Sequence, residues 1–315
     1  MPASTATAPG KIILFGEHAV VYDRPAIAVP VFKVSARAVV TPGIGAPPGQ
    51  INILAQDIGI EAEINDLSQA DPIRKVIEIL LAELQIDRPP AFNLQISSTI
   101  PIAAGMGSGA AVSVAIIRVI SGFLGYTLAD EVVSKLAYEV ERLHHGTPSG
   151  IDNSVVTYGK PIFFVRQQPI EQLQVGEELN FVIADTGIAS PTAIAVRDLK
   201  QAWLAEQRTY DKLFDEIADI VNQARKTIAI GNGKELGRLL DKNHEILSYL
   251  GVSSPELNNL CVVAREAGAL GAKLSGAGRG GNMIAIVDST NVEEISHALT
   301  ASGAKRTIIT SINAD

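Results

Sequence analysis

The sequence predicts an α+β fold built from two domains, and three observations lead to this prediction. The chain has 315 residues, which is more than a single hydrophobic core usually serves. Its first part alternates Val- and Ile-rich runs with turn-forming residues, as strands do. Its last part, after a long helical region, gives the order strand, strand, helix, strand. The polar stretch 166–178 is the predicted junction, so that residues 1–172 form one domain and residues 173–315 the other.

The first elements are predicted strands, because they are rich in β-branched residues and lie between turn formers such as Pro42-Gly43. They cover 11–15, 26–40 and 51–64. This spacing predicts antiparallel hairpins. A helix is predicted over 72–84, where Pro72 suits the first turn.

The centre of the first domain is a predicted strand, turn and buried helix. The strand 92–98 runs into Pro101 and a glycine-rich turn. Segment 109–123 is rich in alanine and apolar on most faces, which is typical of a helix inside a domain. An amphipathic helix follows and ends before Gly146, and Thr127 with Asp130 resembles a capping box at its start.

The second domain is predicted to follow the strand 161–165 and the polar junction. It opens with an apolar strand over 181–184 and continues through helices between Pro191 and Ala267. It closes with two strands, a helix and a strand, which are centred near Ala272, Met283, Val292 and Ile308.

Composition excludes several classes of protein. The net charge is −8 and no run of basic residues occurs, so we expect no nucleic-acid partner. The N-terminus lacks the charged and apolar regions of a signal peptide, and no apolar run is long enough to span a bilayer. We therefore expect a cytoplasmic protein without a membrane partner. Cys261, the only cysteine, is better read as a buried apolar residue than as a reactive thiol.

The turn Gly105-Met106-Gly107-Ser108-Gly109 is a candidate phosphate site. Its glycines allow the backbone to approach an anion, and a following helix presents free N–H groups and a positive dipole end. A plain turn that needs positive φ is the alternative, but the order strand, turn, buried helix favours a rigid anion site. The turn matches neither a P-loop nor a dinucleotide fingerprint, so an oxidoreductase is disfavoured.

Two carboxylates flank a Pro and Gly turn farther along the chain. Phosphoryl transfer needs a metal ion and a group that orients or deprotonates the attacking hydroxyl. Glu141, near a helix C-terminus, could hold the ion, and Asp152 could face the alcohol. Alternatively, Glu141 is a solvated helix charge and Asp152 an N-cap. The adjacent His144 and His145 point about 100° apart on a helix and cannot chelate one ion together.

The N-terminal segment and a second glycine-rich turn contain further candidates. Lys11 precedes a strand and could lower the pKa of a reacting hydroxyl or carboxyl, while Glu17 and His18 follow it and could bind a polar substrate. Alternatively, Lys11 is an exposed residue that begins a hairpin. The turn within 273–281 lies between strands, where so many glycines indicate close backbone approach.

Segments 8–22, 105–109 and 273–281 resemble, in order, the three motifs of the GHMP kinases, which include galactokinase and homoserine kinase. The resemblance covers nearly the whole chain, and 8–22 and 145–153 are most similar to the members that act on mevalonate. It implies a first domain like domain 2 of ribosomal protein S5 and a ferredoxin-like second domain, with ATP and Mg²⁺ as cofactors. It also implies a homodimer.

The function implied by the resemblance is ATP-dependent phosphorylation of the primary hydroxyl of mevalonate. Kinases for phosphomevalonate, homoserine or a sugar are alternatives, since they share the nucleotide apparatus. A non-catalytic metabolite sensor is disfavoured because Lys11 and Asp152 are present. A decarboxylating relative is disfavoured because Lys11, Glu141 and 145–153 match the kinases better.

The resemblance also implies roles for single residues. Asp152 is the catalytic base with Lys11 as its cationic neighbour, and Glu141 and Ser108 hold the metal. The nucleotide is lined by Ser98, Ala103, Ala104, Gly105, Met106, Gly107, Ser108 and Gly109. The substrate is contacted by Glu17, His18, Asp152, Thr186, Gly276 and Ala277.

Two positions depart from the family pattern. Gly109 stands where the second motif usually has a serine whose hydroxyl helps to hold Mg²⁺, so Ser108 or a water must substitute. Arg279 stands where the third motif usually has glycine, so its guanidinium reaches toward either phosphate or a neighbouring loop.

Overall fold

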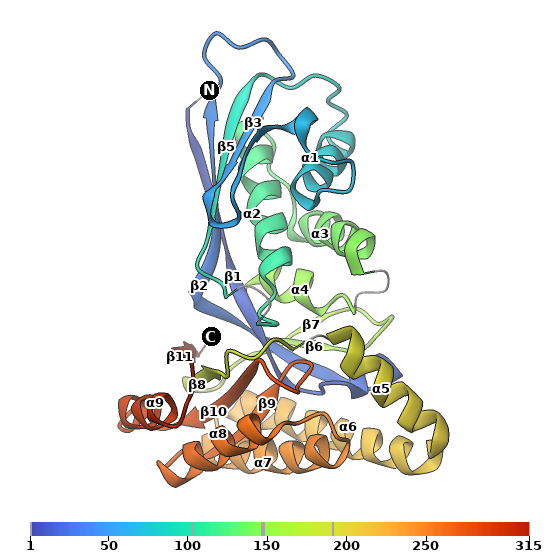
Figure 1. The fold of residues 1–315 in the computed structure, drawn as a ribbon, viewed down its shortest axis with the longest axis vertical. Coiled ribbons are helices and arrows are strands. Elements are labelled where there is room, and N and C mark those ends of the chain that lie inside the picture. Colours follow the sequence, from blue (N-terminus) through green and yellow to red (C-terminus); the bar gives the residue numbers. More distant parts are fainter. Residues whose placement is uncertain (1, 102–103, 146–148, 191, 315) are drawn as a thin grey trace. The chain divides into compact units, whose positions relative to one another are not determined.

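The computed structural model describes residues 2–101, 104–145, 149–190 and 192–314, without the side chains of residues 144 and 145 (Figure 1). The chain forms two compact units, each assembled from three segments. The first unit comprises Met1–Gly10, Val34–Pro101 and Gly107–Gly159. The second comprises Lys11–Lys33, Ile102–Met106 and Lys160–Asp315. This division differs from a single boundary between residues 172 and 173, because the segments of the two units alternate along the chain.

The sheet of the first unit has the strand order β4-β3-β5-β2. These strands are β2 (Ala26–Pro42), β3 (Ile51–Ala55), β4 (Ile60–Glu63) and β5 (Phe92–Ser98). β5 pairs antiparallel with the second half of β2 and parallel with β3. Alternate residues of β5 are buried, which is typical of a sheet covered on one face.

The predicted hairpin between 26–40 and 51–64 is wrong, because β3 pairs with β4 and β5 rather than with β2. An antiparallel hairpin does occur, but it joins β3 and β4 within the run 51–64. The structure differs from the predicted run 51–64 because the 3-10 turn Gln56–Ile58 interrupts it. Gly59 follows this turn with φ 70°, a conformation that glycine adopts at little cost. The first strand is also longer than predicted, because β1 covers Ser4–Phe15 and pairs with β2.

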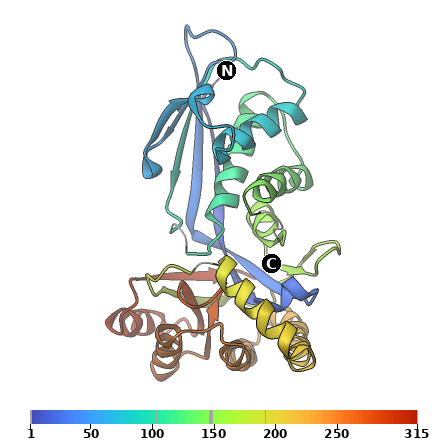
Figure 2. The same ribbon diagram turned by 45° about the vertical axis from the view of Figure 1, so that its right-hand side comes forward.

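The described part of the first unit contains four α-helices, which lie on one side of its sheet, with α2 next to the strands (Figures 1 and 2). They are α1 (Pro72–Glu83), α2 (Ser108–Phe123), α3 (Asp130–His145) and α4 (Ile151–Tyr158). α2 is buried on most of its surface, as its apolar composition predicts. Helices α1, α2 and α3 contact one another, and α4 packs on α2 and α3. The sequence analysis did not assign α4 as a helix.

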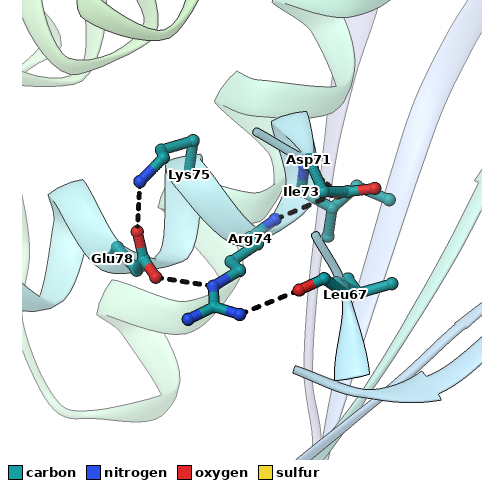
Figure 3. Close-up of polar contacts among 6 residues, drawn as sticks. All are labelled: Leu67, Asp71, Ile73, Arg74, Lys75 and Glu78. Carbon is teal, nitrogen blue, oxygen red and sulfur yellow. Dashed lines mark hydrogen bonds and ion pairs between the residues drawn. The ribbon is translucent and has the colours of Figure 1, made fainter. Parts of the chain in front are cut away.

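At the start of α1, a side chain of the protein provides the hydrogen-bond acceptor for the first N–H groups of the helix (Figure 3). The Asp71 carboxylate accepts hydrogen bonds from the backbone N–H groups of Ile73 and Arg74, at 2.8 and 3.2 Å. The Arg74 guanidinium donates to Glu78 at 2.7 Å and to the Leu67 carbonyl at 2.8 Å. Pro72 occupies the first turn, as predicted.

The second unit is built on an antiparallel sheet with the order β11-β8-β10-β9. Its strands are β8 (Leu179–Asp185), β9 (Gly271–Ser275), β10 (Asn282–Val287) and β11 (Arg306–Ile312). Its helices are α5 (Thr192–Ala205), α6 (Gln207–Ile230), α7 (Gly233–Tyr249), α8 (Pro255–Glu266) and α9 (Val292–Ala301). Helices α7, α8 and α9 pack on the sheet (Figure 2). The predicted closing order of strand, strand, helix, strand is confirmed.

The N-terminal segment of the second unit packs on its C-terminal part. The first residues of β2 pair with β6 (Ile162–Phe164), and β6 pairs with β7 (Glu171–Gln172). β7 lies within the polar stretch that was predicted as a junction. The Tyr22 ring stacks on Phe214 of α6 with centroids 4.4 Å apart. These contacts hold residues 11–33 beside elements that lie more than a hundred residues away in sequence.

No helix in the described part of the chain combines the length and apolarity that crossing a bilayer requires.

Candidate active site

The start of α2 forms one part of the glycine turn and belongs to the first unit. Gly107 is the N-cap with φ 70° and ψ 30°, and its missing side chain leaves the helix without a side-chain cap. Ser108 is half-buried and Gly109 is exposed. The first N–H groups of a helix have no partner within the helix, and its dipole places positive potential there. This helix start is therefore suited to an anion.

The other part of the turn belongs to the second unit, where two of its carbonyls are held. The Asn282 side-chain amide donates to the Ala104 carbonyl at 2.6 Å. The Lys11 backbone N–H donates to the Met106 carbonyl at 3.0 Å. Gly105 lies between them with φ 71° and is exposed. Ala103, the other residue predicted here, lies outside the described residues.

The two predicted carboxylates lie on helices that pack against α2 and against each other. Glu141 is half-buried in the last part of α3, and Asp152 is half-buried in the first turn of α4. The N-cap of α4 is Gly150 with φ 89°, so the interpretation of Asp152 as an N-cap is wrong. The first unit thus groups Ser108, Glu141 and Asp152 on three mutually packed helices.

Ser98 is the last residue of β5 and leads toward the glycine turn. Its backbone N–H donates to the Asp57 carboxylate at 2.7 Å, and its hydroxyl accepts from the Ile100 N–H at 3.2 Å. The hydroxyl therefore helps to form the bend that ends β5.

Glu17 is fully enclosed in the second unit, with only 1% of its surface exposed. Its carboxylate forms an ion pair with Lys273 of β9, which is also buried and donates to the Leu274 carbonyl at 2.6 Å. Burial raises the pKa of the Glu17 carboxyl, and the Lys273 ammonium opposes that rise. Oε2 of Glu17 is buried without a hydrogen-bond partner among the described residues.

His18 connects the N-terminal segment to the third motif. Its Nε2 lies 3.0 Å from the Ala277 carbonyl, and since a carbonyl only accepts, Nε2 carries the proton. Burial lowers the pKa of His18 to about 4, so the ring is neutral near neutral pH. The second unit thus brings His18 and Ala277 together, and their contacts with a substrate stay a prediction.

The third glycine turn is packed too closely for side chains at two positions. A Cβ on Gly278 would lie 1.8 Å from the Val252 carbonyl oxygen, and one on Gly280 would lie 2.7 Å from the Ile188 carbonyl oxygen. The Thr186 N–H and hydroxyl both donate to the Gly281 carbonyl, at 2.9 and 3.0 Å. The predicted close backbone approach is therefore present, and it places Thr186 beside the turn that contains Gly276 and Ala277.

Arg279 reaches a neighbouring helix. Its Nη1 lies 2.6 Å from Oδ2 of Asp198 on α5. The residue has φ 58°, a conformation that glycine adopts more readily than arginine. The ion pair, together with the bond from the Arg279 N–H to the Val252 carbonyl at 2.9 Å, helps to hold that conformation.

Sequence reasoning missed three residues that support these turns: Asp198, Lys273 and Asn282. Lys273 carried one signal, because a charged residue inside an apolar strand must find a partner when it is buried. Asn282 carried another, since a polar residue directly after a glycine turn opens the buried strand β10. Nothing local in the sequence identified Asp198, which lies on a partly exposed helix.

Family models match both parts of the chain. The N-terminal domain of the GHMP kinases matches residues 71–160, and the C-terminal domain of the GHMP kinases matches residues 223–305. The mevalonate kinase of Thermococcus sibiricus is 35% identical over 319 residues, covering 95% of this chain and 93% of its own. The chain belongs to the GHMP kinases. Kinases of this family use ATP.

Solved structures agree with this assignment. The mevalonate kinase of L. major in complex with R-mevalonate has a TM-score of 0.85 and 30% identity, covering 99% of this chain and 96% of that chain. The Methanococcus jannaschii mevalonate kinase has a TM-score of 0.86 and 27% identity, with coverage of 99% and 98%. The predicted two-domain GHMP kinase fold is confirmed.

Proposed function

We propose that this chain phosphorylates the primary hydroxyl of mevalonate with ATP to give 5-phosphomevalonate. The observation that carries the proposal is the 35% identity to a mevalonate kinase over 95% of the chain. The similarity to a structure with bound R-mevalonate supports it further. The enzyme would act in isoprenoid precursor synthesis.

In this proposal the glycine turn binds the phosphates of ATP. Gly105 and Gly107 have φ of 71° and 70°, and Gly109 offers backbone without a side chain. The N–H groups at the start of α2 would donate to phosphate oxygens and replace water without reorganisation. Ser98 and Ala104 would contribute to the same nucleotide site, as would Ala103.

Asp152 is proposed as the base that accepts the proton of the mevalonate hydroxyl, with Lys11 as its cationic neighbour. Asp152 lies in the first turn of α4, close to the positive end of that helix. Lys11, a residue that is only 5% exposed, would stabilise negative charge that develops on the attacking oxygen.

Glu141 and Ser108 are proposed to hold Mg²⁺. Both offer hard oxygen atoms and lie on helices that pack together. Among the described residues no group of three or more His, Cys, Asp and Glu side chains could hold a metal ion. This fits an ion that takes few protein ligands and completes its shell with phosphates and water. When bound, Mg²⁺ neutralises charge on the transferring phosphoryl group.

Glu17, His18, Thr186, Gly276 and Ala277 are proposed to bind mevalonate. Oε1 of Glu17 already forms an ion pair with Lys273, so a contact from Glu17 would use Oε2, which has no hydrogen-bond partner among the described residues. His18 donates to the Ala277 carbonyl, and this bond would fix the third motif against the N-terminal segment.

A coupled assay of ADP release tests the proposed function. Mevalonate, phosphomevalonate, homoserine and galactose are compared with the same enzyme and MgATP. We expect turnover with mevalonate and a kcat/KM at least about 100-fold lower with the others, because a site built to pair with particular polar groups rejects compounds that lack them. Turnover of another alcohol without turnover of mevalonate would overturn the substrate assignment. ATP binding without turnover of any alcohol would favour a sensor.

The Asp152→Asn variant tests the role of the base. We expect kcat to fall by about 100- to 10,000-fold, while nucleotide affinity measured with a nonhydrolysable ATP analogue stays close to that of the wild type. Unchanged turnover would contradict the role of Asp152 as base. A homodimer is also proposed, and sedimentation equilibrium measures it.

A further inference from the structure

The amide of Asn282 has a fixed position in the second unit. Asn282 is the first residue of β10, which is the only strand paired with both β8 and β9 in the described sheet. Its backbone is in register with Asp185 on one side and Ser275 on the other. Only 2% of the residue is exposed. The side chain therefore starts from a backbone that the sheet holds on both sides.

This amide reaches the glycine turn across a large separation in sequence. Nδ2 of Asn282 donates to the Ala104 carbonyl at 2.6 Å, although 178 residues separate the two. A buried hydrogen bond of this kind is strong locally, because no water competes for the carbonyl. The bond joins the residue that follows the third motif to the residue that precedes Gly105.

A second bond holds the same turn on the other side of Gly105. The Lys11 backbone N–H donates to the Met106 carbonyl at 3.0 Å. Both carbonyls are thus directed at groups inside the second unit. Ala104 and Met106 are buried, whereas Gly105 between them is exposed.

Because the peptide bond is planar, the two held carbonyls also fix the directions of the N–H groups of Gly105 and Gly107. The C=O and N–H of one trans peptide point to opposite sides of the chain. Since the Ala104 carbonyl points at Asn282, the N–H of Gly105 points away from it, and the Met106 carbonyl fixes the N–H of Gly107 in the same manner. Neither N–H donates to another residue within the described ranges.

We propose that Asn282 is a positioning residue that orients the N–H of Gly105 toward the phosphates of ATP by holding the Ala104 carbonyl. This inference rests on the proposed function, since it requires the turn to bind nucleotide. Asn282 touches neither nucleotide nor alcohol in this proposal. Its loss should therefore weaken nucleotide binding more than it changes the use of mevalonate.

The variants Asn282→Ala and Asn282→Asp test the proposal. Asn282→Ala removes the donor, and Asn282→Asp keeps the shape but places an acceptor against the carbonyl. We expect the Kd of a nonhydrolysable ATP analogue, measured by calorimetry, to rise by about 10-fold or more in both, as for loss of a buried hydrogen bond. The KM for mevalonate should stay within about threefold, an effect of about 0.6 kcal/mol.

Asn243→Ala is the matched control. Asn243 is also a buried asparagine of the second unit, and its side chain makes no hydrogen bond to the described residues. We expect its nucleotide Kd to equal that of the wild type. Thermal unfolding of all three variants shows whether a rise in the nucleotide Kd reflects a misfolded protein or a change in the turn of a folded one.

The pH profile of Asn282→Asp gives a readout that a purely structural role would not move. A protonated carboxyl regains a donor, so the ratio of variant Kd to wild-type Kd should fall between about pH 8 and about pH 6. Equal nucleotide affinity of folded Asn282 variants and wild type would overturn the inference. Absence of nucleotide binding by the wild type would instead overturn the proposed function.

Discussion

Helices α1 and α2 belong to the same unit but begin in opposite ways. The first N–H groups of α1 are satisfied by the Asp71 carboxylate, and Arg74, Lys75 and Glu78 form ion pairs around it (Figure 3). α2 begins at Gly107, which has no side chain with which to cap the helix. Both starts carry the same backbone requirement. The Asp71 side chain satisfies the start of α1, whereas the start of α2 has no side-chain cap, which agrees with the proposal that its N–H groups bind a ligand.

The largest effect on nucleotide affinity is expected when a side chain is added in the glycine turn before α2. Gly105→Ala places a methyl group on an exposed residue with φ 71°, where a Cβ meets no protein atom within 4 Å. We expect a loss of about 1 kcal/mol in unfolding free energy from backbone strain. We also expect nucleotide affinity to fall by about 10-fold or more, because the methyl group would occupy space that the phosphates approach.

Gly125→Ala is the control for that strain. Gly125 follows the other end of α2, has φ 86°, and likewise has no atom within 4 Å of an added Cβ. It should lose similar stability and keep its affinity for an ATP analogue in calorimetry. If the two variants lost affinity equally, the turn would have no special relation to nucleotide.

Asp71→Ala, at the start of α1, is expected to lower stability without changing substrate binding. Removing the cap leaves two N–H groups without their acceptor, so the unfolding free energy in urea should fall by about 1 kcal/mol. The KM values for ATP and mevalonate should not change. Asp66→Ala removes an exposed carboxylate from the same connection and should leave stability nearly unaltered. A changed KM for ATP in Asp71→Ala would contradict the separation of roles.

Gly109→Ser tests the departure from the family at α2. A Cβ at Gly109 meets no protein atom within 4 Å, so a serine fits without displacing its neighbours. If its hydroxyl completes the Mg²⁺ shell, as the family pattern implies, the Mg²⁺ concentration for half-maximal nucleotide binding should fall several-fold, since each added oxygen ligand strengthens the site.

Gly122→Ser is the matched control for Gly109→Ser, because Gly122 is an exposed glycine of the same helix with equal room for a Cβ. It should leave the Mg²⁺ dependence unchanged. Identical Mg²⁺ curves for Gly109→Ser and wild type would mean that this position does not face the ion.

The smallest effect is expected at the ion pairs of α1. Glu78→Gln removes the acceptor of Arg74 and Lys75, at 2.7 and 2.8 Å. Such helix pairs contribute about 0.3–0.5 kcal/mol each, and salt screens them. Urea unfolding should show a loss below about 1 kcal/mol at low salt, and less in 1 M NaCl. A loss that does not respond to salt would point to packing rather than charge.

Local patterns predicted the elements that carry the proposed site. The strand β5, the glycine turn and the buried helix α2 follow from residues that are neighbours in sequence, because strand and helix periods are local properties. The two-residue strand β7 and the helix α4 were missed, since both are too short to build a periodic pattern. The roles of Lys11, Glu141 and Asp152 stay predictions.

Contacts between distant segments could not be predicted in the same way. Asn282 meets Ala104 across 178 residues, and Glu17 meets Lys273 across 256. Their pairing depends on how strands are ordered in a sheet, which a single sequence does not state. Arg279 illustrates the limit well, because the residue was singled out from the family pattern, but only the fold reveals Asp198 as its partner.

The long strands β1 and β2 each contribute to both units, and this has a consequence for evolution and engineering. A fragment that begins at Lys160 would lack Lys11–Lys33, a segment of the second unit. It would leave Lys273 buried without Glu17 and Phe214 without Tyr22. The second unit therefore cannot be excised or exchanged as a contiguous C-terminal fragment. Recombination that exchanges the C-terminal half must also supply a compatible N-terminal segment.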